Sequence, residues 1–246
     1  MSIPSCCLKA FEWDGNPTGR TEVVANRDVY IAGDNPDAAV VIIHDLLGWT
    51  FPNARLLADH YAREANATVY LPDFFGGEVL NPETILQGRF HEFDLDGFMK
   101  RNSREVREPE IFEFARALRA KHAKVGAAGF CYGGWAVFRL GAEEHRPPLV
   151  DCVVAGHPSL LTKEDMDAVT VPVQVLAPEH DFVFTPELKS YCFKAVMKRG
   201  VPFEYLHFPG VEHACLVRGD SGKPGERDAM ARGKTAAVAW FNQFLH

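Results

Sequence analysis

A cysteine flanked by glycines is the feature of this sequence that most directly suggests chemistry. Gly129-Phe130-Cys131-Tyr132-Gly133-Gly134 follows an apolar run typical of a buried strand and precedes a segment with helical spacing. This spacing matches the strained strand-to-helix turn that exposes a nucleophile, with cysteine in place of serine. Glycines two residues before and after the cysteine keep side chains from colliding across such a turn. The pattern therefore predicts nucleophilic attack by a Cys131 thiolate.

The residue after the cysteine would assist the same chemistry. Tyr132 would supply a backbone N–H at a helix N-terminus, where the positive potential favours an oxyanion and a thiolate. The alternative interpretation is a buried cysteine that only packs in a glycine-rich turn. A dinucleotide-binding turn is disfavoured, because it requires G-x-G-x-x-G and no such pattern occurs.

An acid and a base follow the cysteine in the order expected for a catalytic triad. Asp181 follows a predicted strand over 171–177, and His213 follows a predicted strand over 203–208. His213 would take the thiol proton, and Asp181 would fix its tautomer. Other polar residues near strand ends are interpreted as solvated or structural: Glu179, His180, His44, His157 and His207.

Strands and helices alternate along the chain. Strands are predicted over 22–31, 38–44, 67–71, 124–130, 151–155, 171–177 and 203–208, and helices over 53–64, 105–121, 132–144, 186–199 and 225–245. Continuous apolar strands between helices are typical of a mostly parallel sheet covered on both faces. We therefore predict one α/β domain spanning residues 1–246, with a long loop at about 73–96 as a cap or substrate loop.

Composition narrows the classes of function. The chain has 246 residues, 47% of them hydrophobic, and a net charge of −7, which disfavours nucleic acid or anionic lipid as the main partner. Neither a signal peptide nor an apolar run of membrane-spanning length is recognised. Scattered cysteines without a C-x-x-C pair fit a reducing compartment, so we expect a cytoplasmic protein. A monomer and a homodimer both remain open.

These motifs resemble the dienelactone hydrolase family, an α/β-hydrolase family marked by a G-x-C-x-G-G elbow with Asp and His downstream. The resemblance covers nearly the whole chain. It includes the segments 41–48 (VIIHDLLG), 71–77 (LPDFFGG) and 210–214 (GVEHA). The opening Cys6-Cys7 and the segment 15–19 (GNPTG) look like the fungal branch.

The resemblance implies further site residues. A second oxyanion donor maps to the Leu46 backbone N–H, and an acidic residue that interacts with the resting thiol maps to Asp45, which is one methylene shorter than the Glu of bacterial members. Asp45 could instead cap the following turn. Arg218 resembles an arginine that binds the substrate carboxylate, offset by one residue. The remaining candidates are Arg101, Arg104 or Arg107 for a second carboxylate contact, and Trp49 and Phe75 for an apolar pocket, with solvated charges and core packing as the alternatives.

The leading hypothesis is a cysteine-dependent hydrolase of a small carboxylic ester or lactone, working through an acyl-thioester and needing no metal or cofactor. A rival is a non-catalytic small-molecule-binding protein that retains the fold. A third reading is a redox-responsive protein using Cys6-Cys7 or Cys131, although adjacent cysteines rarely pair with each other.

Overall fold

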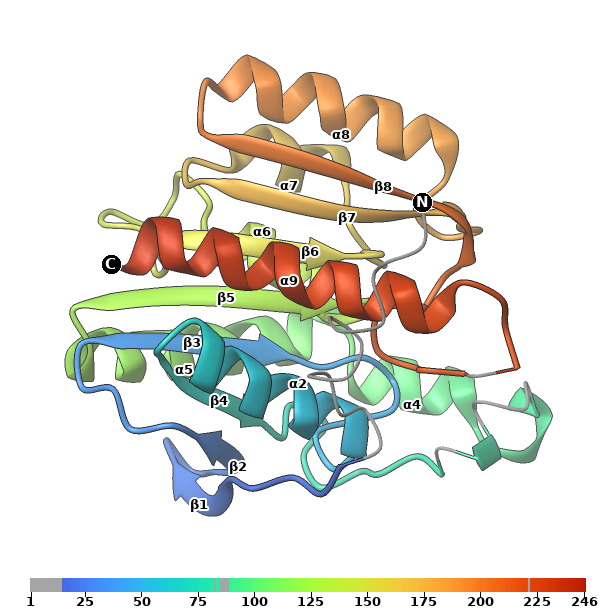
Figure 1. The fold of residues 1–246 in the computed structure, drawn as a ribbon, viewed down its shortest axis with the longest axis horizontal. Helices are drawn as coiled ribbons and strands as arrows, with labels where there is room; N and C mark the ends of the chain where they lie inside the picture. Colours follow the sequence, from blue (N-terminus) through green and yellow to red (C-terminus); the bar gives the residue numbers. More distant parts are fainter. Residues whose placement is uncertain (1–14, 82, 85–88, 221) are drawn as a thin grey trace.

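A computed structural model describes residues 15–81, 83–84, 89–220 and 222–246 of the chain. Eight strands form one sheet (Figure 1). They are β1 Arg20–Val24, β2 Arg27–Ala32, β3 Ala38–Ile43, β4 Thr68–Pro72, β5 Lys124–Phe130, β6 Cys152–Gly156, β7 Val173–His180 and β8 Phe203–Glu212. The helices are α2 Pro52–Glu64, α4 Leu95–Arg101, α5 Arg104–Lys121, α6 Gly133–Leu140, α7 Lys163–Ala168, α8 Pro186–Arg199 and α9 Glu226–Leu245, with a short 3₁₀ helix at Phe90–Glu92.

The sheet has the strand order β1-β2-β4-β3-β5-β6-β7-β8. β1, β2 and β4 pair antiparallel, and every pair from β4 through β3 to β8 is parallel. Ile43 lies beside Gly129, and Gly129 lies beside Ala155. The carboxyl ends of β3, β5 and β6 therefore reach one edge of the sheet, where open α/β sheets bind ligands.

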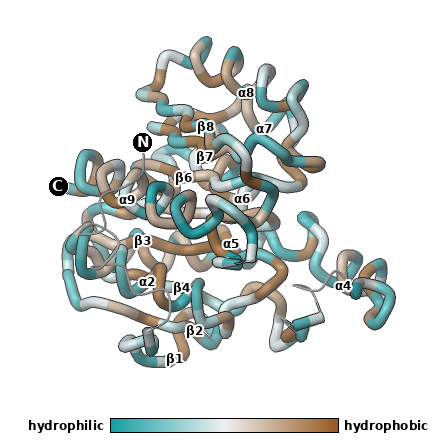
Figure 2. The backbone as a smooth tube through the Cα atoms, turned by 45° about the vertical axis from the view of Figure 1, so that its right-hand side comes forward, coloured by the Kyte–Doolittle hydropathy of each residue, from teal (hydrophilic) through white to brown (hydrophobic). Residues whose placement is uncertain are grey.

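Helices cover both faces of the sheet, which confirms the predicted α/β-hydrolase architecture. Helices α2 and α9 contact each other and one face, whereas α5, α6 and α8 pack on the other (Figure 1). The central strands are the most hydrophobic part of the chain, and the helices are largely hydrophilic where they face outward (Figure 2). β3, β4 and β6 are buried along their whole length, as expected for strands covered on both sides.

The predicted single strand over 22–31 is wrong, because the structure has a hairpin of β1 and β2 there. Ala25 and Asn26 form its turn with φ values of 48° and 62°. Consecutive left-handed residues match the right-handed twist of paired strands. The turn was missed because Ala-Asn lacks the glycine that normally marks it.

Several boundaries also differ from the prediction. Helix α6 ends at Leu140 and not near 144, with Gly141 as its C-cap. The predicted loop at 73–96 ends two residues early, because α4 begins at Leu95 with Asp94 accepting a hydrogen bond from the Gly97 N–H. Helix α7 was not predicted, although Thr162 and Asp165 form a capping box at its start. Short helices of this kind carry too little periodicity to be recognised.

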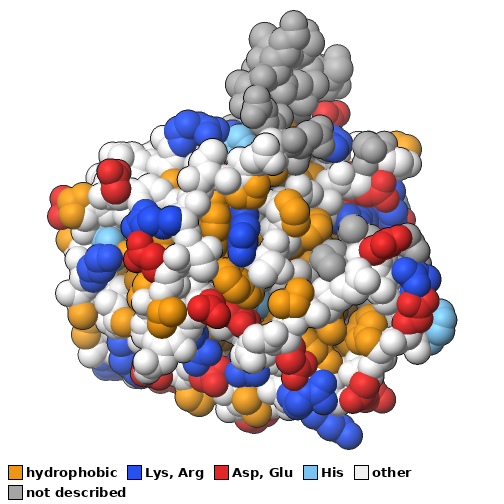
Figure 3. Space-filling model, turned by 90° about the horizontal axis from the view of Figure 1, so that it is seen from below, with side chains coloured by type: hydrophobic (Ala, Val, Ile, Leu, Met, Phe, Trp, Pro, Cys, Tyr) orange, Lys and Arg blue, Asp and Glu red, His pale blue; other side chains and the backbone are white. Residues whose placement is uncertain are grey.

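The surface shows charges of both signs. On the face drawn in Figure 3, acidic, basic and hydrophobic side chains are interspersed. Within the described residues, none of the helices combines the length and the hydropathy needed to cross a membrane.

Candidate active site

Cys131 lies on a left-handed turn between β5 and α6. Its φ of 47° is rare for a residue with a side chain, and it marks stored backbone strain. A Cβ on Gly129 would lie 2.1 Å from the Gly133 carbonyl oxygen, and a Cβ on Gly133 would lie 2.0 Å from that of Ile43. Only glycine fits either position. The turn therefore presents a half-buried thiol at the carboxyl edge of the sheet.

His213 and Asp181 form a hydrogen-bonded pair at the same edge. The His213 Nδ1 donates to Asp181 Oδ2 at 2.9 Å. The other Asp181 oxygen accepts the backbone N–H groups of Val183 and Phe184 at 2.9 and 2.8 Å. Since Nδ1 is occupied, His213 is left to interact with the Cys131 sulfur through Nε2. A carboxylate bonded in this way orients both the ring and its tautomer.

In this pair, each residue stabilises the charged form of the other. Burial alone lowers the pKa of His213, but its interactions with Asp181 and Cys131 outweigh burial and raise the pKa from 6.5 to about 10. Burial raises the pKa of Asp181, but the hydrogen bond and charge of His213, together with the backbone N–H groups of Phe184 and Val183, outweigh burial and lower the pKa from its usual value. The site therefore favours an imidazolium beside the Asp181 carboxylate.

Two residues after β6 contact the cysteine, and sequence reasoning assigned neither to the site. The Cys131 N–H donates to His157 Nδ1 at 3.1 Å. Ser159 Oγ lies 3.2 Å from Cys131 Sγ, within hydrogen-bond range for sulfur. The available signal was His157-Pro158-Ser159 at the end of a buried strand. His157, which the sequence marks as structural, contacts the cysteine backbone and packs on His213 with ring centroids 4.9 Å apart.

An exposed aromatic ring also borders the site. Phe182 follows Asp181 directly, is 83% exposed, and has its ring centroid 5.6 Å from that of His213. Its position supplies an apolar surface beside the imidazole.

Asp45 and Leu46 follow β3 at the same edge. The buried Asp45 carboxylate accepts the Leu47 N–H at 2.9 Å, which is the turn-capping contact, and lies close enough to His213 for their charges to interact. Burial raises the pKa of Asp45 from 3.8 to about 6. Leu46 is half-buried and lies in the turn that Asp45 caps.

We expect Asp45→Asn to stabilise the protein at neutral pH. A carboxyl with a folded pKa of about 6 and an unfolded value of 3.8 contributes stability below pH 4 that is lost as the pH rises through 6. The neutral amide oxygen still accepts the Leu47 N–H. Urea unfolding near pH 7 should give the variant about 1–3 kcal/mol more free energy of unfolding, and the difference should shrink towards zero near pH 4. A difference independent of pH would contradict a buried, reluctantly ionised carboxyl.

The two aromatic candidates occupy different environments. Phe75 is fully buried, and its ring packs edge-on against His44, Phe98 and Tyr132. Trp49 is half-buried, with the Arg55 guanidinium 4.9 Å from its ring centroid. Phe75 therefore packs within the wall below the site, and Trp49 lies nearer the surface.

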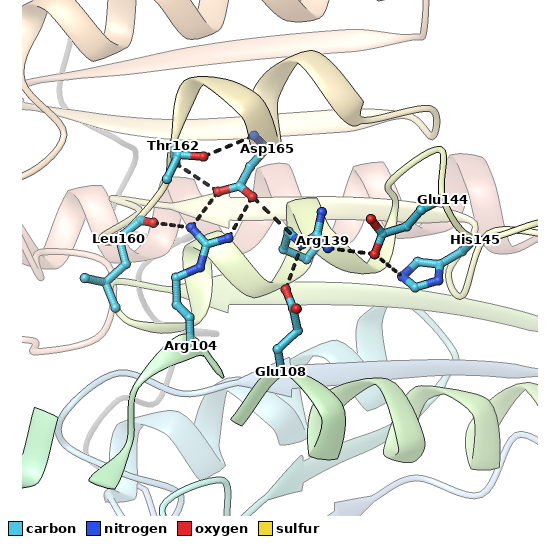
Figure 4. Close-up of polar contacts among 8 residues, drawn as sticks. All are labelled: Arg104, Glu108, Arg139, Glu144, His145, Leu160, Thr162 and Asp165. Carbon is cyan, nitrogen blue, oxygen red and sulfur yellow. Dashed lines mark hydrogen bonds and ion pairs between the residues drawn. The ribbon is translucent and has the colours of Figure 1, made fainter. Parts of the chain in front are cut away.

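Each candidate arginine is already bound to carboxylates of the chain. Arg101 pairs with Glu78, Arg107 with Glu110, and Arg218 with the buried Glu226. Arg104 forms a bidentate pair with Asp165, at 2.8 Å for both bonds, and also donates to the Leu160 carbonyl (Figure 4). A substrate carboxylate would have to compete with these partners for an arginine.

Comparisons with known proteins agree with this architecture. The sequence model of the Dienelactone hydrolase family matches residues 28–245. The chain is 28% identical to the Hydrolase tropI of Talaromyces stipitatus over 99% of this chain and 98% of that protein. It is 27% identical to the Carboxymethylenebutenolidase homolog of Mus musculus over 92% of this chain and 91% of that protein.

A solved structure shows the same fold. The crystal structure of a putative dienelactone hydrolase from Klebsiella pneumoniae superposes with a TM-score of 0.71 at 18% identity, covering 92% of this chain and 99% of that one. The fungal relative agrees with the resemblance to the fungal branch, although Cys6 and Cys7 lie outside the described residues. The chain belongs to the dienelactone hydrolase family and is a hydrolase of the carboxylic ester and lactone class.

Proposed function

We propose that the protein opens a small carboxylic ester or lactone through an acyl-thioester on Cys131, with His213 as base and Asp181 as the orienting acid. The observation that carries the proposal is the geometry around His213. Its ring is held by Asp181 through a 2.9 Å bond and interacts with a thiol on a turn with φ of 47°. Such a constellation activates a nucleophile that is weak alone.

The reaction would follow from these positions. The Cys131 thiolate attacks the carbonyl carbon, forming a C–S bond while the carbonyl electron pair moves to oxygen. The backbone N–H groups of Leu46 and Tyr132 stabilise that oxyanion. Collapse breaks the C–O bond, and His213 gives its proton to the leaving oxygen. Water then attacks the thioester while His213 takes its proton, and the thiolate leaves.

The same proposal gives the neighbouring residues their roles. Asp45, buried near His213, is the acidic residue that interacts with the resting thiol. The half-buried Trp49 and the exposed Phe182 supply apolar contacts for the substrate, whereas Phe75 is core packing. Arg218 binds Glu226 through Nε, and one of its terminal nitrogens is buried without a hydrogen-bond partner among the described residues, so this nitrogen could bind a substrate carboxylate.

Trapping the covalent intermediate tests the proposal. Brief incubation with a small aryl ester, followed by acid quenching and peptide mass analysis, should find the acyl group on the Cys131 peptide. Hydroxylamine should remove that group, because it cleaves a thioester. Steady turnover with no acyl group on Cys131, or an acyl group on another residue, would refute the mechanism.

A further inference from the structure

The segment that follows β6 forms hydrogen bonds to three atoms of Cys131: its backbone nitrogen, its carbonyl oxygen and its sulfur. His157 Nδ1 accepts the Cys131 N–H at 3.1 Å, and the Ser159 N–H donates to the Cys131 carbonyl at 2.8 Å. The third contact joins Ser159 Oγ and Cys131 Sγ at 3.2 Å. We call residues 157–160 the β6 loop. Through two backbone bonds, this loop fixes the distance at which the serine hydroxyl faces the sulfur.

The β6 loop is itself held in place. His157 and Leu160 both have positive φ, at 35° and 56°, which costs free energy and persists only where the surroundings impose it. A Cβ on Gly134 would lie 2.4 Å from Pro158, so only glycine lets the loop approach the start of α6 this closely.

A charged network anchors the far end of the loop. Arg104 binds the Leu160 carbonyl and Asp165, and Asp165 in turn caps the Thr162 N–H at the start of α7 (Figure 4). Arg104 thus joins helix α5 to the β6 loop. Contacts at both ends of the β6 loop therefore fix the position of Ser159.

The chemistry of the two groups decides which one donates. A serine hydroxyl both donates and accepts, whereas a thiol is a weak donor. Once the thiol proton is on His213, the sulfur can only accept. An O–H group that points at a negatively charged acceptor forms a bond about twice as strong as a neutral one. The charged site therefore favours the arrangement in which Ser159 donates.

We propose that Ser159 is a further catalytic residue, whose hydroxyl donates a hydrogen bond to the Cys131 sulfur whenever that sulfur is a thiolate. The inference rests on the proposed function, since it takes Cys131 as nucleophile and His213 as base. Ser159 keeps its own proton throughout. Its bond is made in the free enzyme, is lost when sulfur bonds to the acyl carbon, and is regained when the thioester breaks and the thiolate leaves.

The test is the pH dependence of Cys131 alkylation by iodoacetamide, followed by mass analysis of the Cys131 peptide. In Ser159→Ala the midpoint of the alkylation profile should move up by about one pH unit, because a hydrogen bond to a charged group is removed. Below both midpoints the variant holds about tenfold less thiolate, so its kcat/KM for a small aryl ester should be about tenfold lower there and should approach that of the parent above them. Ser159→Thr, which keeps the hydroxyl, should return the midpoint to within about half a pH unit and kcat/KM to within about threefold of the parent.

Two results for the midpoint of the Ser159→Ala alkylation profile would overturn the inference. An unchanged midpoint would show that the hydroxyl only packs, and a downward shift would show that it accepts from the neutral thiol. Ser159→Gly removes the same hydroxyl and replaces the alanine variant if that variant does not fold. Cys131→Ala measured in parallel separates the two ideas: full activity there defeats the proposed function, whereas an inactive Cys131→Ala with an unshifted Ser159→Ala defeats only this inference.

Discussion

Cys131→Ala is expected to lower kcat/KM for a small activated ester by about 10⁴-fold or more, equivalent to about 5.5 kcal/mol of transition-state stabilisation. The reason is that no covalent intermediate can form, while the oxyanion donors and the imidazole stay in place. Alanine is compatible with the fold, because the side chain of Cys131 is only half-buried and its backbone bonds to Gly156 and His157 remain. Steady-state kinetics on a chromogenic aryl ester measures the effect.

A second cysteine provides a matched control. Cys192 lies on α8, is fully buried, and burial raises the pKa of its thiol to about 12. Cys192→Ala removes the same atoms from the chain at a site away from the sheet edge, so it should leave kcat/KM within about twofold. Circular dichroism and thermal unfolding should show both variants folded. Parent-like turnover in Cys131→Ala would assign the chemistry to another nucleophile.

The strands were the most predictable part of the fold. Parallel strands buried on both faces are largely apolar, so runs such as 38–43 and 125–130 mark them directly. The β1–β2 turn was missed because its left-handed residues, Ala25 and Asn26, include no glycine. Such a turn is determined by the pairing of the two strands, and strand pairing cannot be recognised from the local sequence alone.

In the candidate site too, the local geometry could be predicted from the sequence, whereas the tertiary contacts could not. Gly129 and Gly133 surround Cys131 in the sequence, so the local geometry of the turn could be predicted from spacing alone. The arginines show the opposite case. Arg104 and Arg218 bind Asp165 and Glu226, and those partners are chosen by packing between helices and loops. Ser159 likewise reaches the sulfur only because β5 and β6 are neighbours in the sheet.

Asp181→Asn is expected to lower kcat by about 10⁴-fold while leaving KM within a few-fold, as the equivalent change does in a serine protease triad. The asparagine oxygen can still accept the Val183 and Phe184 N–H groups, so the loop keeps its shape. Its amide, however, carries no negative charge to balance an imidazolium, and an NH₂ group facing His213 favours the wrong tautomer. The pKa of His213, raised to about 10 by its partners, should fall towards 6.5.

Glu179→Gln is the control that makes this result specific. Glu179 is an exposed carboxylate two residues before Asp181, and it accepts the Gly210 N–H at 2.7 Å, a bond that the glutamine oxygen also makes. Its kcat should stay within about twofold, since it does not touch His213. NMR titration of the His213 ring should show the lowered pKa in Asp181→Asn and a parent-like pKa in Glu179→Gln. The reverse pattern would move the orienting acid to Glu179, because the carboxylate that holds the imidazolium must be the one whose removal releases its proton.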